Sequence, residues 1–169
     1  MVRILLSIVL IVSSISAGSV CAARTDLPVT ASVIAVVSGA EIDIVVTRSA
    51  IEDVAADRKV VRVVYHGILP PGRFDPLYME AFDLNWNLVN DSEIFLEPAA
   101  APWDEEGRLQ AYVYLDPGGY GMVNAFLLAA GLARIEPGFA DDEPHAALLA
   151  GIAVTAEHAD LGIWRTAKD

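Results

Sequence analysis

The 169-residue sequence contains a single cysteine, Cys21. An internal disulfide needs two thiols and a cysteine-based zinc site needs at least two thiolates, so the chain can form neither. Any bound metal ion would have to be held by carboxylates or histidines. Hydrophobic residues make up 54% of the chain and charged residues 20%, which is typical of one globular domain and excludes a disordered or fibrous protein.

Basic residues are also scarce. The chain has 11 lysines and arginines against 23 aspartates and glutamates, a formal net charge of −12. A surface of this sign repels a phosphate backbone, so tight, sequence-independent binding of nucleic acid is not expected. The sequence does not identify a partner, and a small anion is the most that a few local cations would hold.

Long apolar runs are missing too. The apolar stretch at residues 4–12 is much shorter than the ~20 residues that cross a bilayer. It follows Arg3 and precedes the small residues at 16–23, which is the pattern of a secretory signal. We therefore predict a signal peptide at residues 1–23, a domain at residues 24–169 and no transmembrane segment after processing. The protein would be exported, to the periplasm or the extracellular space.

Cys21 would carry lipid if cleavage fell just before it. The preceding Gly18-Ser19-Val20 lacks the leucine usual in a lipoprotein signal, and it has a bulky valine where a small residue is expected. We therefore expect Cys21 to leave with the signal peptide. The mature chain would then contain 10 basic and 23 acidic residues and no thiol.

Periodicity predicts three strands, a helix, two strands and two helices, in that order. The β-branched runs at 30–37 and 42–47 predict a hairpin, and residues 60–65 predict a third strand. Apolar residues three and four apart at 76–90 predict a helix with Asp75 as N-cap. We expect strands at 94–96 and 109–115 around a loop at 98–106, then helices at 122–130 and 142–159, the first ended by Gly131.

Four short segments of the second half follow one another in a characteristic order. They are Glu106-Gly107-Arg108-Leu109-Gln110-Ala111-Tyr112, Met122-Val123-Asn124, Gly131-Leu132-Ala133 and Gly162-Ile163-Trp164. In order and spacing they resemble the staphylococcal-nuclease-like (thermonuclease) family, and the resemblance extends from Val33 to Trp164. It implies an α+β, mainly β fold: a five-stranded OB-fold barrel packed by three helices. It also implies that Asn124 bonds backbone groups between helix and sheet.

The resemblance implies a calcium-dependent nuclease site in active members. There, calcium is held by an aspartate in the first hairpin turn and by another in a Gly-Ile-Asp-x-Pro-Glu segment, whose glutamate activates water. In this sequence the corresponding positions are Ala40, Leu69 and Gly72, or Gly67 and Pro70 in a second alignment frame. Calcium requires several oxygen ligands, so we expect no cofactor here, and calcium only if the site has been rebuilt from other residues.

One arginine matches a phosphate-binding arginine of the family, and a second lies near the position of the other. Arg108 corresponds to the arginine of the Gly-Arg strand, and Arg62 lies two residues before the matching Val64, on the same face of its strand. Both are candidate phosphate-facing residues. The alternative is structural: an ion pair of Arg108 with Asp104 or Glu106, and of Arg62 with a neighbouring carboxylate.

For the other candidate side chains, the sequence favours a structural role. Glu41 and Asp43 are the acids nearest the first turn, and His66 could act as a general base but has no visible nucleophile or metal partner. His145 and His158 do not share a helix face, so they are not a metal pair. Aromatic residues that could stack bases lack a basic track beside them, so packing is expected for Trp86, Trp103, Trp164, Tyr112 and Tyr114.

Two functional hypotheses remain. The first is an exported nuclease-like protein without metal-dependent nuclease activity, which serves as a binding or structural module. The second is an active secreted phosphodiesterase that hydrolyses DNA or RNA, with a site rebuilt from Arg62, Arg108 and unmatched acids such as Glu41.

Overall fold

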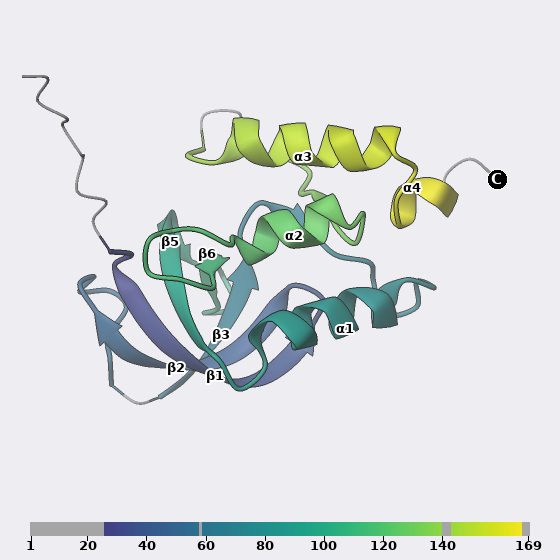
Figure 1. Cartoon of the computed structure of the whole chain (residues 1–169). Coiled ribbons are helices and arrows are strands. Elements are labelled where there is room, and N and C mark those ends of the chain that lie inside the picture. Colours follow the sequence, from purple (N-terminus) through teal and green to yellow (C-terminus); the bar gives the residue numbers. More distant parts are fainter. Residues whose placement is uncertain (1–25, 58, 140–142, 167–169) are drawn as a thin grey trace, which may run out of the picture.

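The computed structural model describes residues 26–57, 59–139 and 143–166 (Figure 1). The predicted signal peptide and Cys21 lie outside these residues. The strands are β1 (Val29–Ser38), β2 (Glu41–Ser49), β3 (Val60–Tyr65), β4 (Ile68–Leu69), β5 (Glu93–Trp103), β6 (Leu109–Tyr114) and β7 (Arg134–Ile135). The helices are α1 (Tyr78–Val89), α2 (Val123–Ala129), α3 (Ala146–His158) and α4 (Ile163–Thr166).

Five strands form a closed barrel in the order β1-β2-β3-β6-β5, as the resemblance implied. All neighbouring pairs are antiparallel except β3 and β6, which are parallel, and β5 closes the barrel against β1. Alternate residues of the strands point inward, so Ile42, Ile44, Ile94 and Leu96 are fully buried. The fold is therefore α+β and mainly β.

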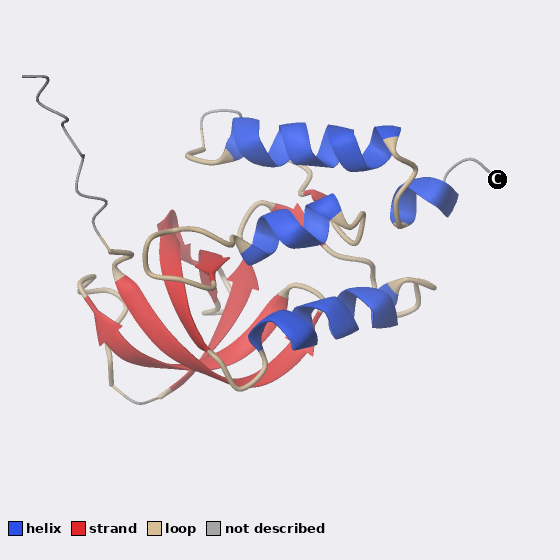
Figure 2. Ribbon diagram, viewed as in Figure 1, coloured by secondary structure: helices blue, strands red, loops and turns tan. Residues whose placement is uncertain are grey.

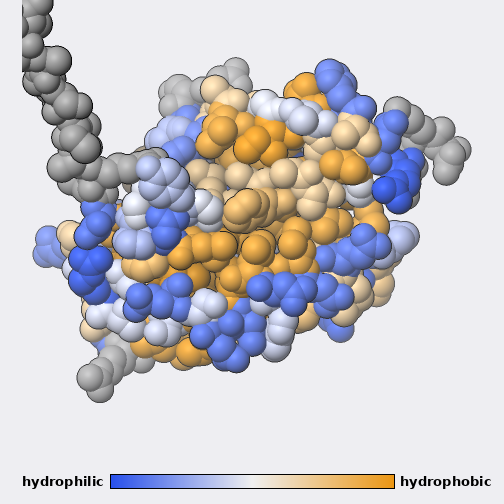
Figure 3. All heavy atoms as spheres, viewed as in Figure 1, coloured by the Kyte–Doolittle hydropathy of each residue, from blue (hydrophilic) through white to orange (hydrophobic). Residues whose placement is uncertain are grey.

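The helices lie together on one side of the barrel (Figure 2). Helix α1 packs on β1, α2 packs on β6 and on α1, and α3 packs on α2. Apolar side chains gather over this face (Figure 3), and Phe126, Leu148 and Val154 are among those that stay exposed. No helix in the described ranges combines the length and the apolar character needed to span a bilayer.

Two buried asparagines connect helices to the barrel. The Asn124 amide on α2 accepts the N–H of Val113 at 3.0 Å and donates to the carbonyl of His66 at 3.0 Å. This confirms the role that the resemblance implied for Asn124. The Asn85 amide on α1 accepts the hydroxyl of Tyr65 at 2.7 Å and donates to the carbonyl of Ser38 at 2.8 Å.

A close approach of two backbones joins the end of α2 to the start of α4. The N–H of Ile163 donates to the carbonyl of Gly131 at 2.9 Å. Gly131 has φ +68°, and a Cβ there would lie 2.3 Å from the carbonyl oxygen of Leu161. Only glycine fits this position, which confirms that Gly131 ends α2.

Several predicted boundaries were wrong. Strand β5 continues to Trp103, where a loop was expected after Leu96, because proline's φ suits an extended strand and a register shift between Pro98 and Trp103 accommodates the missing donors. Helix α1 begins at Tyr78, since the carboxylate of Asp75 accepts the N–H of Leu77 in a turn before the helix.

The last predicted helix was also too long at its start. Its described part begins at Ala146, after Pro144, and residue 142 lies outside the described residues. The structure adds three short elements that periodicity could not indicate: the one-turn helix α4 and the two-stranded pairing of β4 with β7. The three predicted helices correspond to α1, α2 and α3.

Candidate functional site

A cleft of about 450 Å³ lies between the β1–β2 turn, the segment after β4 and the start of α1. Ala40, Leu69 and Gly72 all line it, together with Arg108, which directly precedes β6. These are the positions that the first alignment frame assigns to the calcium ligands and the base. In the second frame, Pro70 also lines the cleft, whereas Gly67 lies against the Phe139 ring, 2.8 Å from an added Cβ.

The side chains of this cleft do not fit a calcium ion. Ala40, Leu69 and Gly72 offer no side-chain oxygen, and the carboxylates that line the cleft are those of Glu41 and Glu136. Calcium takes six to eight oxygen ligands, so the carboxylates of Glu41 and Glu136 alone form a poor calcium site. Among the described residues, no group of three or more His, Cys, Asp or Glu side chains is placed to hold a metal ion.

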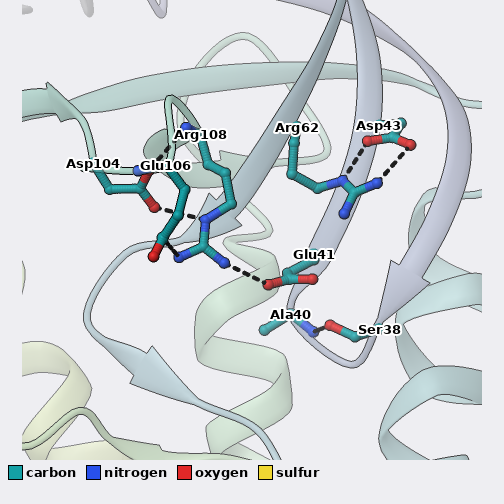
Figure 4. A network of polar contacts seen from close by, with 8 residues as sticks. All are labelled: Ser38, Ala40, Glu41, Asp43, Arg62, Asp104, Glu106 and Arg108. Carbon is teal, nitrogen blue, oxygen red and sulfur yellow. Dashed lines mark hydrogen bonds and ion pairs between the residues drawn. The ribbon is translucent and has the colours of Figure 1, made fainter.

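Arg108 is bound by three carboxylates (Figure 4). Its Nε donates to Asp104 at 2.7 Å, one terminal nitrogen donates to Glu106 at 2.5 Å, and the other donates to Glu41 at 3.2 Å. The hydrogen bond to Asp104 is the largest cause that raises the pKa of Arg108 above its ordinary value. Arg108 thus forms the ion pairs that its spacing to Asp104 and Glu106 suggested, and Glu41 adds a third from β2.

Asp104 organises the turn before β6. Its Oδ1 accepts the backbone N–H groups of Glu106 at 3.0 Å and of Arg108 at 2.8 Å. Partial burial opposes ionisation of this carboxyl, but the backbone and side-chain hydrogen bonds from Arg108 outweigh it and lower its pKa. The guanidinium of Arg108 is therefore held in place by a carboxylate that is itself fixed by the turn.

Arg62 forms an ion pair with a carboxylate on the neighbouring strand. It lies opposite Asp43 in the β2–β3 ladder, and its guanidinium donates from Nε at 2.5 Å and from Nη2 at 3.1 Å to the two oxygens of Asp43. This hydrogen bonding raises the pKa of Arg62. Arg62 therefore forms the carboxylate pair that was the structural alternative to a phosphate-facing role. A contact of either arginine with phosphate stays a prediction.

A family model described as Staphylococcal nuclease homologue matches residues 73–166, more than half of the chain. The chain belongs to this family. A comparison with curated proteins gives no significant match. The family match includes α1, the strands β5 and β6 and all later elements. Asp104 and Arg108, which lie between β5 and β6, are also inside the match. Ala40, Leu69 and Gly72 precede it.

A second cavity of about 250 Å³ adjoins the cleft in this nuclease homologue. Val64, Arg108 and Glu136 line both. The smaller cavity is more polar, with His66 and the carboxylates of the 104–106 turn in its wall. The two cavities therefore meet at Arg108, so the charge around this residue decides what either of them can hold.

His66 is mostly enclosed, with 13% of its side chain exposed. Its Nδ1 lies 3.0 Å from the Gln110 side-chain oxygen, its Nε2 lies 3.6 Å from Glu143, and its ring packs edge-on against Tyr112 and Phe139. These contacts agree with a packing role in the loop after β3.

His145, just before α3, belongs to a polar cluster that the sequence did not indicate. Its Nε2 lies 2.9 Å from Glu97 and 3.1 Å from the hydroxyl of Tyr114. The ring of Tyr112 packs edge-on against His145, and burial, with Glu143 and Glu97 nearby, raises the pKa of Tyr112 to about 12. His158 is exposed at the other end of α3. The two histidines are therefore not a metal pair.

The base-stacking candidates differ in burial, and Trp86 and Trp103 stay 44% and 39% exposed. Tyr112 and Tyr114 are buried, Trp86 stacks on Phe82, and the indole N–H of Trp103 donates to the carbonyl of Asp53 at 3.2 Å. The side chains that line the cleft include one aromatic ring, that of Tyr78. The arrangement is consistent with packing roles for the residues considered as base-stacking candidates.

Proposed function

We propose that this chain is an exported member of the nuclease homologue family that works as a binding or structural module, without metal-dependent phosphodiesterase activity. One observation carries the proposal. Ala40, Leu69 and Gly72 line one cleft beside Arg108, and none of the three brings a side-chain oxygen. A calcium-dependent nuclease needs carboxylates there to hold the ion and to activate water.

The state of the arginines supports the same proposal. A phosphate-binding arginine needs donors directed at the ligand, but the Nε and both terminal nitrogens of Arg108 already donate to carboxylates. These bonds take three of the five N–H groups of Arg108, and a phosphate that accepted the other two would meet all three carboxylates as like charges. Electrostatic attraction of the transition state is therefore weak at this edge of the barrel.

An active nuclease with a rebuilt site is the competing hypothesis. Glu41 is the acid on which it depends, because this carboxylate lines the cleft and contacts Arg108 at 3.2 Å. Glu41 would then have to bind a cation or activate water while it also neutralises the arginine.

Hydrolysis assays on the mature protein separate the two hypotheses. Single- and double-stranded DNA and RNA are incubated with calcium and with a chelator, and calcium binding is followed by calorimetry. We expect no cleavage in either condition and no stoichiometric calcium site. The variant carrying Ala40→Asp, Leu69→Asp and Gly72→Glu restores the acids and serves as the matched control for calcium binding. Calcium-dependent cleavage by the unmodified protein, lost in Glu41→Gln, would establish the competing hypothesis.

Oligonucleotide binding gives an independent measurement. The mature chain carries 23 acidic and 10 basic residues, and screening at ~0.15 M salt has a length of about 8 Å. A long polymer is therefore repelled, and a mononucleotide or other small anion binds with at most millimolar affinity. Micromolar binding of an oligonucleotide that is lost in Arg108→Ala would contradict the proposal.

Export is the remaining part of the proposal. Arg3, the apolar stretch at 4–12 and the small residues at 16–23 support cleavage near Ala22 or Ala23. Mass spectrometry of the secreted protein should then give a chain that a maleimide reagent does not label. Labelling by maleimide, or incorporation of a fatty acid, would mean that Cys21 is retained.

A further inference from the structure

The cleft and the smaller cavity form two adjoining compartments of different character. The cleft has a volume of about 450 Å³ and apolar walls that include Ala40, Ile68 and Leu69. The smaller cavity has a volume of about 250 Å³ and is lined by Asp104, Glu105 and Glu106. Since Val64, Arg108 and Glu136 line both, one ligand can occupy both compartments.

The charge of these walls is negative even though two arginines belong to them. Five acids line the compartments, namely Glu41, Asp104, Glu105, Glu106 and Glu136, together with the bases Arg73 and Arg108. Three of the acids bind Arg108, which leaves Glu105 and Glu136 as exposed carboxylates for which no ion pair is present among the described residues. The walls therefore complement a cation.

Apolar surface continues outside the acidic compartment. Leu69 in the cleft wall is 43% exposed, and Phe74, which follows Arg73 of the cleft wall, is 99% exposed. Pro70 and Pro71 add further apolar surface in the cleft. A purely cationic ligand such as a polyamine would leave this surface uncovered, whereas a peptide that combines an apolar and a basic side chain would cover it.

We propose that the cleft binds a basic peptide segment, with a lysine or arginine side chain in the acidic compartment and a neighbouring apolar side chain against Leu69, Pro70 and Pro71. This inference rests on the proposed function and names the class of partner. The cation lies between the carboxylates of Glu136 and the 104–106 turn, where its charge adds to the neutralisation that Arg108 begins. The apolar neighbour removes Leu69 from water, which favours binding in proportion to the apolar area buried.

The test uses three labelled peptides of equal length, followed by fluorescence anisotropy in the presence of a chelator. One alternates leucine with lysine, the second replaces leucine by serine, and the third replaces lysine by glutamate. The first peptide should bind, the second should bind more weakly, and the third should not bind. Binding should weaken as salt is raised, because the charged groups are partly exposed.

Variants locate the site. Loss of an exposed charge pair costs up to about 1 kcal/mol, so the Glu105→Gln, Glu136→Gln double variant should weaken binding of the leucine-lysine peptide about tenfold. The matched control is the Glu52→Gln, Glu157→Gln double variant, which removes the same charge from exposed positions outside both compartments and should change the Kd less than about twofold. Arg108→Met removes a positive charge and should strengthen binding.

The outcomes are distinguishable. Equal weakening by the two double variants would overturn the inference, because it would mean non-specific attraction to an acidic surface. Equal binding of the leucine and serine peptides would also overturn it, and so would binding of the glutamate peptide lost in Arg108→Met. Failure of all three peptides to bind, with no nuclease activity, overturns this inference alone, whereas calcium-dependent hydrolysis would overturn the proposed function.

Discussion

The interface between α2 and the barrel and the cleft edge around Arg108 satisfy their polar groups in opposite ways. At the interface, the neutral Asn124 is fully buried and pairs both ends of its amide with backbone groups. At the cleft edge, Arg108 is 35% exposed and is held by three carboxylates. The buried hydrogen bonds of Asn124 hold a helix to the barrel without any charge, so we expect that the charges of the cleft can change without loss of the fold.

The largest loss of stability is expected where the backbone at the end of α2 meets the backbone before α4. Gly131→Ala forces a left-handed residue to carry a Cβ 2.3 Å from the Leu161 carbonyl oxygen, which should lower the free energy of unfolding by about 3 kcal/mol. Urea denaturation measures this. Gly151→Ala is the control, because its Cβ meets open space in α3 and should stabilise the protein by about 0.5–1 kcal/mol. Equal midpoints for the two variants would contradict the close approach.

Asn124→Ala should have the next largest effect. It leaves the N–H of Val113 and the carbonyl of His66 without their partner, at a cost of about 1–3 kcal/mol. Asn87→Ala removes an exposed amide from α1 and should change stability by less than about 0.5 kcal/mol. If both variants unfold at the same denaturant concentration, the buried amide does not stabilise the interface.

The ion pairs of the cleft edge should matter less. Asp104→Asn should destabilise the protein by about 1 kcal/mol at neutral pH. The pKa of Asp104 lies below its ordinary value of 3.8 in the folded state, so its contribution is present above that pH and is lost as the pH falls through the folded pKa.

Denaturation at a series of acidic pH values measures this loss, which should be smaller in Asp104→Asn than in the unmodified protein. The exposed Asp83→Asn on α1 is the control and should leave the acid dependence unchanged. An unchanged acid dependence in Asp104→Asn would mean that the turn does not need an ionised carboxylate.

Tyr112→Phe should have the smallest effect and the opposite sign. The buried hydroxyl has no hydrogen-bond partner among the described residues, so its removal should stabilise the protein by up to about 1 kcal/mol. The folded pKa of about 12 exceeds the ordinary 10.0, so ionisation of this phenol leaves stability unchanged below pH 10 and lowers it as the pH rises from 10 to 12, where the unfolded chain releases the proton and the folded one holds it.

Alkaline denaturation, with tyrosinate absorbance followed in parallel, checks this difference. The variant should lose less stability than the unmodified protein between these pH values. The exposed Tyr120→Phe is the control for the absorbance change of an accessible phenol. A tyrosinate signal that is equal in both variants would contradict the burial of Tyr112.

The local sequence was enough to predict most strands of the barrel, whereas their closure into a barrel was implied by the family resemblance. The β-branched run at Val60–Tyr65 was predicted with its observed bounds, because valine favours the extended conformation of a strand. Helix α1 was predicted from the spacing of its apolar residues. Its buried residues are Ala81, Asn85 and Val89, so one buried position is polar. A polar residue four positions from Ala81 was the available signal that a buried hydrogen bond forms there.

The candidate site divides in the same way. The absence of carboxylates at Ala40, Leu69 and Gly72 is a property of the sequence, and so are the nearby partners of Arg108 at Asp104 and Glu106. Only the tertiary structure decided that Glu41 completes the set, that Arg62 faces Asp43 and that His145 meets Glu97. These contacts join strands and loops far apart in the chain, and their register depends on how the barrel closes, which no local pattern encodes.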